Sequence, residues 1–237
     1  MLRGTDDSGE LLVPLAIFDL DNTLLAGDSD YLWGRFLSET GAVDGATYER
    51  ENLRFFQQYQ AGSLDIHEFL RFSLRPLKEN PLERLLSWRE AFLQTKIDPI
   101  ITQAALDLVN SHRQAGDTLL IITATNSFVT QPIAERLGIP HLIGTDPEMK
   151  RGRYTGYVAG IPSFREGKVE RLRLWLHAHA LDLQGSTFYS DSHNDIPLLD
   201  LVDHPVAVDP DAQLADYAAA RNWPVITLRD PPLPAPG

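Results

Sequence analysis

Short apolar runs alternate with amphipathic segments along this sequence, and the alternation limits the folds that the chain can adopt. Runs at 15–20, 118–123, 187–190 and 205–208, with a weaker one at 224–227, predict buried β-strands. Helical periodicity separates most of them, at 127–137, 165–180 and 211–220. Strands that alternate with helices usually form a parallel sheet covered on both faces. We therefore expect an α/β fold with a parallel sheet.

One connection is too long for that scheme, because about 94 residues separate the first strand from the second. A crossover between parallel strands needs only about a dozen residues. The segment shows four amphipathic helical patterns, two of them ended by Gly41 and Gly62. We expect an inserted helical-bundle cap domain at 28–96, over the crevice where such sheets bind ligands. The alternative is that these helices only add cover to the sheet.

The rest of the chain completes the predicted organisation. Residues 1–27 and 97–230 are expected to form the core domain, and the proline-rich residues 231–237 a disordered tail. The alternating stretch at 150–160, with Gly152 and Gly156, predicts a small β-hairpin on the core domain.

The totals exclude several classes of function. The 237 residues include no cysteine, so disulfides, thiolate metal sites and a cysteine nucleophile are excluded. A net charge of −12 with no visible basic stripe argues against a nucleic-acid partner. No stretch is long and apolar enough to span a bilayer, and the N-terminus lacks the pattern of a secretory signal. The default expectation is a cytoplasmic protein without a membrane partner, as a monomer or homodimer.

Two carboxylates follow the first apolar run in the segment IFDLDNTL, at Asp19 and Asp21. An Asp-x-Asp pair alone is weak evidence, because acidic turns are common and most of them cap helices. Directly after a buried strand, however, both carboxylates would be costly to bury without a partner. Their position at the strand end indicates a site where a cation could hold them.

A second acidic cluster, YSDSHNDIP, follows the predicted strand at 187–190. Asp191 could bind a cation there, and Asp195 could support it at the start of the next helix. Mg²⁺ suits such a site, since it prefers hard oxygen ligands and commonly uses one or two carboxylates. Helix capping is the structural alternative for Asn194 and Asp195. Two such clusters in one chain favour the metal site.

Two weaker signals lie between these clusters. Thr123 ends a buried strand in the segment LIITATN, where its hydroxyl could donate to a phosphate oxygen. Threonine ends many strands because of its high strand propensity. Lys168 lies near the start of a predicted helix, where a lysine is usually a solvated surface group.

These four segments, in this order, resemble the haloacid dehalogenase-like hydrolase superfamily, and the insertion resembles its subfamily that includes phosphoserine phosphatase. The resemblance covers residues 16–209 and implies a Rossmann-like core with a cap. It implies an aspartyl-phosphate on Asp19, Asp21 as general acid and base, phosphate binding by Thr123 and charge neutralisation by Lys168. It also implies Mg²⁺ held by Asp19, the main-chain carbonyl of Asp21 and Asp191, with Asp195 in support.

The resemblance implies a phosphoric monoester hydrolase whose partner is a small phosphorylated metabolite. Substrate contacts are expected from Asp28, Thr123, Ala124, Asn126, Lys168 and Asn194. Asp28 matches a Glu that contacts the substrate amine in phosphoserine phosphatases, so both phosphoserine and an amine such as histidinol phosphate fit. A carboxylate-bearing substrate would also need a cap arginine, for which the candidates are Arg54, Arg71 and Arg75.

Two functions from other classes stay open on the sequence alone. A phosphotransferase would pass the phosphoryl group from Asp19 to an acceptor other than water. A non-catalytic binding protein could use the same fold, although both Asp19 and Asp21 are present. A protein phosphatase fits less well, because a helical insertion over the crevice would obstruct a bulky substrate.

Overall fold

A computed structural model describes residues 13–229 of the chain. The predicted disordered tail at 231–237, and the N-terminal residues considered as a secretory signal, lie outside the described residues. Within the described range, no helix combines the length and the apolar character needed to cross a membrane.

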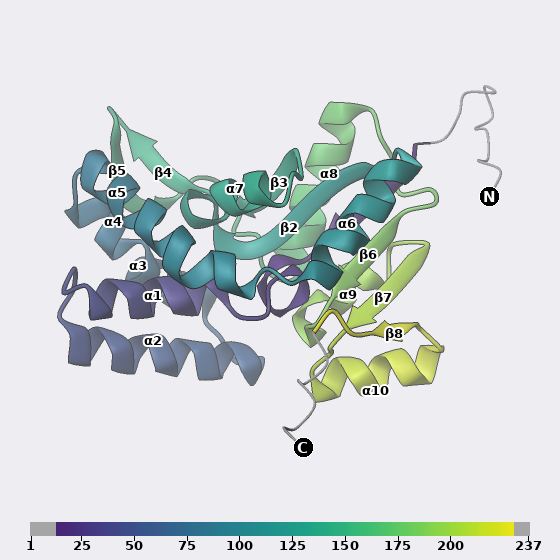
Figure 1. Cartoon of the computed structure of the whole chain (residues 1–237), viewed down its shortest axis with the longest axis horizontal. Coiled ribbons are helices and arrows are strands. Elements are labelled where there is room, and N and C mark those ends of the chain that lie inside the picture. The colour runs from purple at the N-terminus through teal and green to yellow at the C-terminus, as the bar shows by residue number, and fades with distance from the viewer. Residues whose placement is uncertain (1–12, 230–237) are drawn as a thin grey trace, which may run out of the picture.

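Six parallel strands form the main sheet, in the order β3-β2-β1-β6-β7-β8 (Figure 1). Their bounds are Leu15–Phe18 for β1, Thr118–Asn126 for β2, His141–Thr145 for β3, Thr187–Ser190 for β6, His204–Val208 for β7 and Val225–Ile226 for β8. The sheet confirms the predicted fold class and all five predicted strands. The sequence analysis missed β3, which pairs with β2 at one edge.

The first strand, β1, lies in the middle of the sheet between β2 and β6. Its side chains alternate between two apolar cores, as the strand period of two requires. Ala16 and Phe18 belong to the core on one face, and Leu15 and Ile17 to the core on the other. All four are buried because helices cover both faces, which explains why the strand reads as an unbroken apolar run.

Helices α6 (Gln103–Ala115) and α7 (Ser127–Arg136) cover one face of the sheet. Val109 and Val129, on these two helices, belong to the same apolar core as Phe18. Helices α8 (Glu166–His179), α9 (Ile196–Leu199) and α10 (Ala212–Arg221) cover the other face. Leu172 and Leu214 from that group pack with Ile17.

The long connection between β1 and β2 contains, ahead of α6, an insertion with five α-helices, on the left of Figure 1. They are α1 (Ser29–Glu39), α2 (Gly45–Gln60), α3 (Ile66–Ser73), α4 (Arg75–Glu79) and α5 (Leu82–Phe92). The chain enters and leaves this insertion at one point, where Leu25 and Ile101 form an isolated antiparallel bridge. The amide of Ala26 also donates to the carbonyl of Ile100 at 2.8 Å.

The insertion also packs on the sheet's helices. Trp33 of α1 is buried with its ring against Phe92 of α5 and Phe128 of α7. Helix α1 therefore shares one apolar core with the helices of the sheet. The insertion thus combines a helical group with cover for the sheet, and its assignment as a separate domain at 28–96 stays a prediction.

The predicted hairpin is present as β4 (Pro147–Lys150) and β5 (Arg153–Val158), which pair antiparallel in a separate two-stranded sheet. The sequence predicted this hairpin on the core domain, whereas in the structure it also packs on the insertion. Strand β5 packs against α3 and α4 of the insertion, and Figure 1 shows the hairpin extending over that side. The hairpin thereby adds a second link between the core and the insertion.

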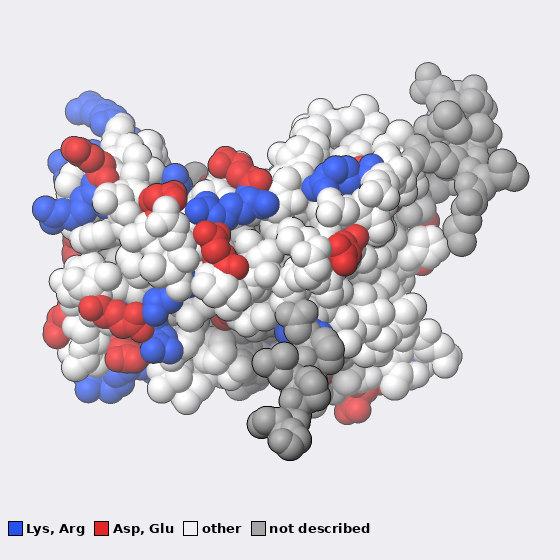
Figure 2. Space-filling model, viewed as in Figure 1, with Lys and Arg blue, Asp and Glu red and all other residues white. Residues whose placement is uncertain are grey.

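Acidic and basic side chains are interspersed over the insertion on the face shown in Figure 2. Many of them form surface ion pairs, such as Arg35 with Glu39 and Arg54 with both Glu51 and Glu68. The surface of the insertion is therefore mixed in charge, in contrast to the pocket described below.

Candidate active site

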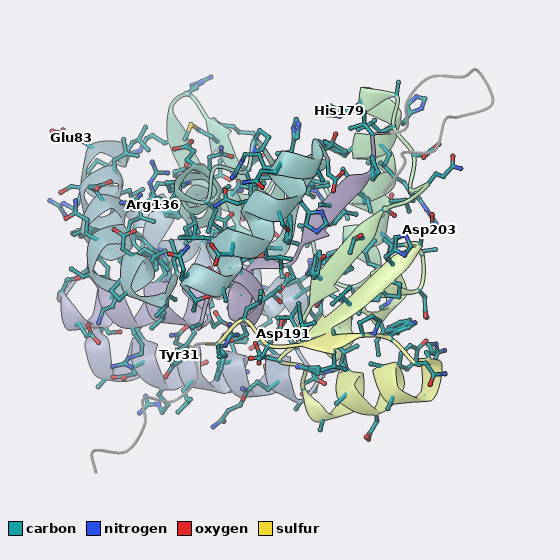
Figure 3. All side chains as sticks on the ribbon, turned by 45° about the vertical axis from the view of Figure 1, so that its right-hand side comes forward. Tyr31, Glu83, Arg136, His179, Asp191 and Asp203 are labelled. Carbon is teal, nitrogen blue, oxygen red and sulfur yellow. The ribbon has the colours of Figure 1, made fainter. Side chains whose placement is uncertain are left out.

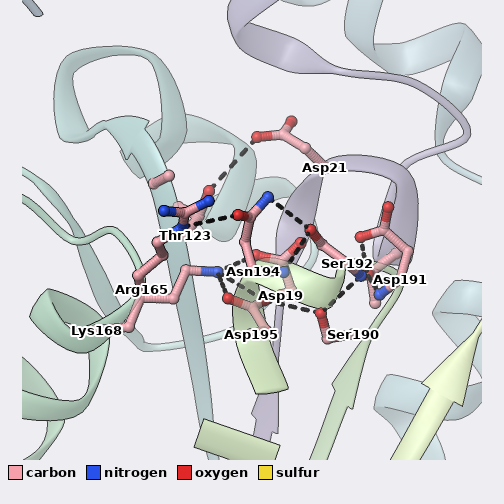
Figure 4. Close-up of polar contacts among 12 residues, drawn as sticks. Asp19, Asp21, Thr123, Arg165, Lys168, Ser190, Asp191, Ser192, Asn194 and Asp195 are labelled. Carbon is pink, nitrogen blue, oxygen red and sulfur yellow. Dashed lines mark hydrogen bonds and ion pairs between the residues drawn. The ribbon is translucent and has the colours of Figure 1, made fainter. Parts of the chain in front are cut away.

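The polar residues predicted from separate segments meet where β1, β2 and β6 end (Figure 4), and Figure 3 labels Asp191 among the side chains of the whole molecule. Asp19 directly follows β1, Thr123 lies near the end of β2, and Asp191 follows β6. These strands are parallel neighbours with β1 in the centre, so their carboxyl ends share one edge of the sheet. A crevice at that edge is the usual ligand site of an open α/β sheet.

Lys168 lies between two carboxylates of this edge. Its Nζ is 2.8 Å from Asp19 Oδ1 and 2.7 Å from Asp195 Oδ1, and its side chain is only 2% exposed. Burial disfavours the charged ammonium, but the two carboxylates outweigh burial and hold the pKa of Lys168 above its ordinary value. Lys168 is therefore a buried cation and not a solvated surface group.

The pKa of Asp19 is raised to about 7, first by burial. Lys168 opposes that rise, while the charges of Asp195 and Asp21 add to it. The carboxyl is almost fully buried. A carboxylate in this position gains strongly from a further positive charge.

Asp191 and Asp195 have different partners in the loop after β6. Ser190 Oγ donates to Asp195 Oδ2 at 2.7 Å, so Asp195 is held by Ser190 and Lys168. The carboxylate of Asp191 accepts only from Thr23 Oγ1 among the described contacts, at 3.1 Å. Burial, followed by the charges of Asp19 and Asp195, raises the pKa of Asp191 well above its ordinary value.

This donor set fits a magnesium ion better than a metal held by the protein alone. Within residues 13–229, no three histidine or acidic side chains are grouped to enclose a metal. Asp19 and Asp191 offer two hard carboxylates, and Mg²⁺ commonly uses one or two of these and completes its shell with water and phosphate. The orientation of Asp195 toward Lys168 agrees with a supporting role.

The carboxylate of Asp21 is turned toward the insertion. It accepts from the amide of Ser29 at 2.6 Å and from the hydroxyls of Thr125 at 2.7 Å and Thr123 at 3.4 Å. Figure 4 shows the contact of Asp21 with Thr123, on the opposite side from Lys168. Asp21 therefore faces a second part of the site.

A pocket of about 560 Å³, partly open to solvent, extends from Asp19 into the insertion. Its lining includes four aspartates, one asparagine, two threonines and one alanine of β2, and a wall of aromatic and aliphatic side chains: Asp19, Asp21, Asp28, Asp30, Tyr31, Asn52, Phe55, Phe56, Tyr59, Leu64, Ile66, Phe69, Thr123, Ala124 and Thr125. Among these described lining residues there is no lysine, arginine or histidine. The pocket is therefore acidic and aromatic.

Asp28 and Asp30 form the acidic part of the insertion end. Asp28 begins α1, where its Oδ1 accepts from the amide of Tyr31 at 2.8 Å. Burial and then the charges of Asp21 and Asp30 raise the pKa of Asp28 well above its ordinary value. Burial and then Asp21 raise the pKa of Asp30 to about 7, although Asn126 donates to it. Both carboxyls lack a cationic partner among these contacts.

Three predicted substrate contacts lie beside the pocket and not in its lining: Lys168, described above, Asn126 and Asn194. Asn126 is buried and begins α7, where its Oδ1 accepts from the amide of Val129 at 3.3 Å. Asn194 is buried in the loop after Asp191, and its Nδ2 lies 3.4 Å from the carbonyl of Tyr59. In contrast, Asp28, Thr123 and Ala124 line the pocket as predicted.

None of the three candidate cap arginines lines the pocket. Arg54 pairs with Glu51 and Glu68 at the surface, at 2.9 Å each. Arg71 and Arg75 are exposed. The expectation that one of these residues meets a substrate carboxylate therefore has no support in the structure.

Sequence reasoning missed Asp30 and Thr125 as site residues. Asp30 looks like the ordinary acidic residue in the first turn of a helix. Thr125 lies two residues after Thr123, on the same side of a strand, and this spacing was a usable signal.

Comparison with known proteins agrees with this geometry. Residues 16–200 match the family model described as haloacid dehalogenase-like hydrolase. A histidinol-phosphatase of Neisseria meningitidis serogroup C (strain 8013) is 47% identical over 219 residues, covering 91% of this chain and 99% of that protein.

Two solved structures are similar along almost the whole chain. A protein of unknown function from Bordetella pertussis Tohama I is 46% identical with a TM-score of 0.87, covering 92% of this chain and 100% of that one. A substrate-bound phosphoserine phosphatase has a TM-score of 0.68 at 19% identity, covering 93% of this chain and 95% of that one, and it shares the fold. Since the family model matches most of the chain, the protein belongs to the haloacid dehalogenase-like hydrolase family.

Proposed function

We propose that this protein hydrolyses a small, amine-bearing phosphomonoester that has no carboxylate, through an aspartyl-phosphate on Asp19 and with Mg²⁺. At the coarser level, the protein is a phosphoric monoester hydrolase of its family that acts on a small phosphoester, in agreement with its phosphatase relative. The single observation that carries the finer proposal is the charge of the pocket. Four aspartates line it together with aromatic rings, without a basic side chain among the described lining residues.

Asp19 is the proposed nucleophile because it is the carboxylate at the end of the central strand and it lines the pocket. Attack on phosphorus forms an acyl phosphate and releases the substrate alcohol, and water then cleaves the acyl phosphate. A phosphate dianion repels a carboxylate, so the ammonium of Lys168, 2.8 Å from Asp19, lowers that repulsion. Mg²⁺ bound by Asp19, Asp191 and the Asp21 carbonyl would neutralise further phosphate charge.

Asp21 is the proposed general acid and base. It lines the same pocket as Asp19 and is oriented by the amide of Ser29 and the hydroxyl of Thr125. From there it can give a proton to the leaving alkoxide and later take one from the attacking water. Thr123 is buried at the end of β2, and its hydroxyl is the proposed donor to a phosphate oxygen.

The insertion end of the pocket sets the proposed substrate class. Asp28 and Asp30 are two carboxylates whose pKa values are raised because burial and like charges disfavour ionisation. A substrate ammonium or imidazolium between them would supply the missing counter-charge. A substrate carboxylate there would face like charges, which costs several kcal/mol. Histidinol phosphate therefore fits better than phosphoserine.

Aromatic rings beside these carboxylates support a cationic and partly flat substrate. The rings of Tyr31 and Phe56 stack with centroids 4.7 Å apart, and Phe55 packs edge-on against Phe69. All four residues line the pocket. Such rings attract cations through their faces and pack well against a planar group such as imidazole.

The test is phosphate release from three substrates by the purified protein, with Mg²⁺ and with chelator. Histidinol phosphate should exceed phosphoserine by at least about 100-fold in kcat/KM, since like charges cost several kcal/mol. p-Nitrophenyl phosphate reports the chemistry without either charged group. Equal rates on phosphoserine and histidinol phosphate would contradict the substrate class, and undiminished release in chelator would contradict the metal.

Arg54→Ala is the matched control for the carboxylate question. Arg54 is a partly exposed surface residue that pairs with two glutamates outside the pocket. Its guanidinium also lies 4.0 Å from the ring centroid of Phe55, which lines the pocket, so its removal should lower kcat/KM for all three substrates alike and by a few-fold at most. A selective loss of phosphoserine hydrolysis would instead show that Arg54 reaches the substrate.

A further inference from the structure

Arg165 has a backbone conformation that arginine rarely adopts. It lies directly before α8, three residues ahead of Lys168, with φ 51° and ψ −122°. This region of positive φ favours glycine, because a Cβ atom crowds the adjacent peptide groups. A strained residue of this kind persists only where its surroundings fix it, and such residues concentrate at functional sites.

The side chain of Arg165 connects the core with the insertion. Its Nε donates to Asn194 Oδ1 at 2.9 Å, and its terminal nitrogen donates to the carbonyl of Gly62. Its guanidinium also lies 5.0 Å from the ring centroid of Phe164. Gly62 directly follows the end of α2, whereas Asn194 belongs to the loop that carries Asp191 and Asp195. Figure 4 shows Arg165 and Asn194 together above Lys168.

The end of α2 is in close contact with the core around this arginine. Asn194 Nδ2 lies 3.4 Å from the carbonyl of Tyr59, one turn before Gly62. A Cβ atom added at Gly62 would lie 2.7 Å from His193 Nε2, so a larger residue there would have to displace the His193 ring. Gly62 also has a φ of +67°. Helix α2 therefore meets the catalytic loops at its C-terminal end.

Helix α2 supplies a large part of the pocket wall, including Asn52, Phe55, Phe56 and Tyr59. The position of this wall relative to Asp19 depends on how the end of α2 lies on the core. We propose that Arg165 is a positioning residue that clamps α2 to the core and thereby sets the substrate wall over the nucleophile. Its catalytic consequence rests on the proposed phosphatase function, whereas the clamp itself does not.

A pair of variants separates the clamp from the stability of the fold. Arg165→Ala removes the side-chain contacts and keeps a Cβ atom at positive φ. Arg165→Gly removes the same contacts and also relieves the strained backbone. The glycine variant should therefore melt about 2–4 °C higher than the alanine variant, an order that the cap position of α8 favours as well. Both variants should lose the clamp equally.

Hydrogen exchange measures the clamp without any turnover. The amides of Ala61, Gly62 and Ser63 bond to carbonyls in the last turn of α2. Their exchange should accelerate about tenfold or more in both variants, because this turn opens more easily once its contact with the core is lost. Amides in the sheet should not change. Arg165→Lys should give intermediate exchange, because an ammonium cannot reproduce the two-sided guanidinium contact.

Activity gives the second readout. In both variants, kcat/KM for histidinol phosphate should fall about 10- to 100-fold, because a misplaced wall loses substrate positioning. p-Nitrophenyl phosphate should lose less than about threefold. Unchanged exchange at residues 61–63 in both variants would overturn the clamp, as would activity that falls only in the less stable variant. If the parent protein hydrolyses none of the substrates, the proposed function fails, and exchange and melting still decide the clamp.

Discussion

At the sheet end of the pocket, the ammonium of Lys168 lies between the carboxylates of Asp19 and Asp195, so buried charges of both signs offset one another. At the insertion end, Asp21, Asp28 and Asp30 gather with only neutral donors, such as amides and hydroxyls. Both ends bury carboxylates, but only the first contains its own cation.

The difference separates the two tasks of the site. Every substrate of a phosphatase carries the same phosphate, so the cation that receives it can be built into the protein. The remainder of the substrate varies, and an acidic wall without a counter-ion selects the substrate that supplies a positive charge. Under the proposed function, Asp19 and Lys168 at the sheet end and Asp21 between the two ends would carry the chemistry, while Asp28 and Asp30 would carry the selection.

The largest effect should come from Asp19→Asn at the sheet end. Asparagine keeps the shape and an acceptor for Lys168 but cannot form the acyl phosphate, so kcat should fall by about 10⁴-fold or more. Single-turnover phosphate release with each substrate measures this. A retained circular-dichroism spectrum is the control for the fold, and substantial residual turnover would refute Asp19 as nucleophile.

Lys168→Met should remove the positive charge that offsets the two carboxylates at the same end. It leaves Asp19 and Asp195 buried without their cation, which should cost about 3–5 kcal/mol of unfolding free energy in urea denaturation. Turnover should fall about 10²- to 10³-fold as well, because the phosphate loses a fixed positive charge. The double variant Lys168→Met/Asp195→Asn should regain part of the stability. If the loss of unfolding free energy were as small as for the replacement of an exposed lysine, Lys168 would not offset the two buried carboxylates.

Asp28→Asn sharpens the comparison at the insertion end. Asparagine still begins α1 well, since it is also a favoured residue at that position, but it removes one negative charge from the wall. The kcat/KM for histidinol phosphate should fall about 10-fold or more, and that for p-nitrophenyl phosphate should stay within about threefold. Asp28→Ala would mix this effect with the loss of a helix cap. Equal losses on both substrates would refute a contact with the amine.

Asp30→Asn should have the smallest effect, on the pH dependence of stability. Asp21 and Asp28 face Asp30, and burial together with Asp21 raises its pKa to about 7 from an ordinary value of 3.8. The folded protein thus holds this proton more tightly than the unfolded chain, and stability declines as pH rises from 3.8 toward 7. The Tm of the variant should decline less than that of the parent between about pH 4 and about pH 7. If Tm declined equally with pH in the variant and the parent, Asp30 would not contribute to the pH dependence of stability.

The sheet end of the site was largely predictable from the sequence. Asp19 and Asp191 each follow a short apolar run, and parallel strands bring such positions to one edge. The strand β3 was missed because the segment at 141–145 begins with histidine, ends in Gly-Thr and follows a proline, which together read as a loop.

The insertion end was less predictable because tertiary packing determines which face of each helix meets the pocket. Asp30 has no local feature that separates it from a helix-stabilising acid. The surroundings of the cap arginines were unpredictable for the same reason, since Arg54 pairs with Glu51 one turn away and with Glu68 on the next helix. No residue near Arg165 in the sequence indicates that its φ is positive.

The bridge between Leu25 and Ile101 makes the insertion a loop of roughly 75 residues with its two ends pinned together. The entropy of closing such a loop grows slowly, by about 0.6 kcal/mol for each doubling of its length. Loop closure would therefore cost little if helices that lie outside the shared apolar core were lengthened or shortened between the two pinned ends. In evolutionary terms, the proposed substrate wall could change through such helices while the residues around Asp19 stay in place.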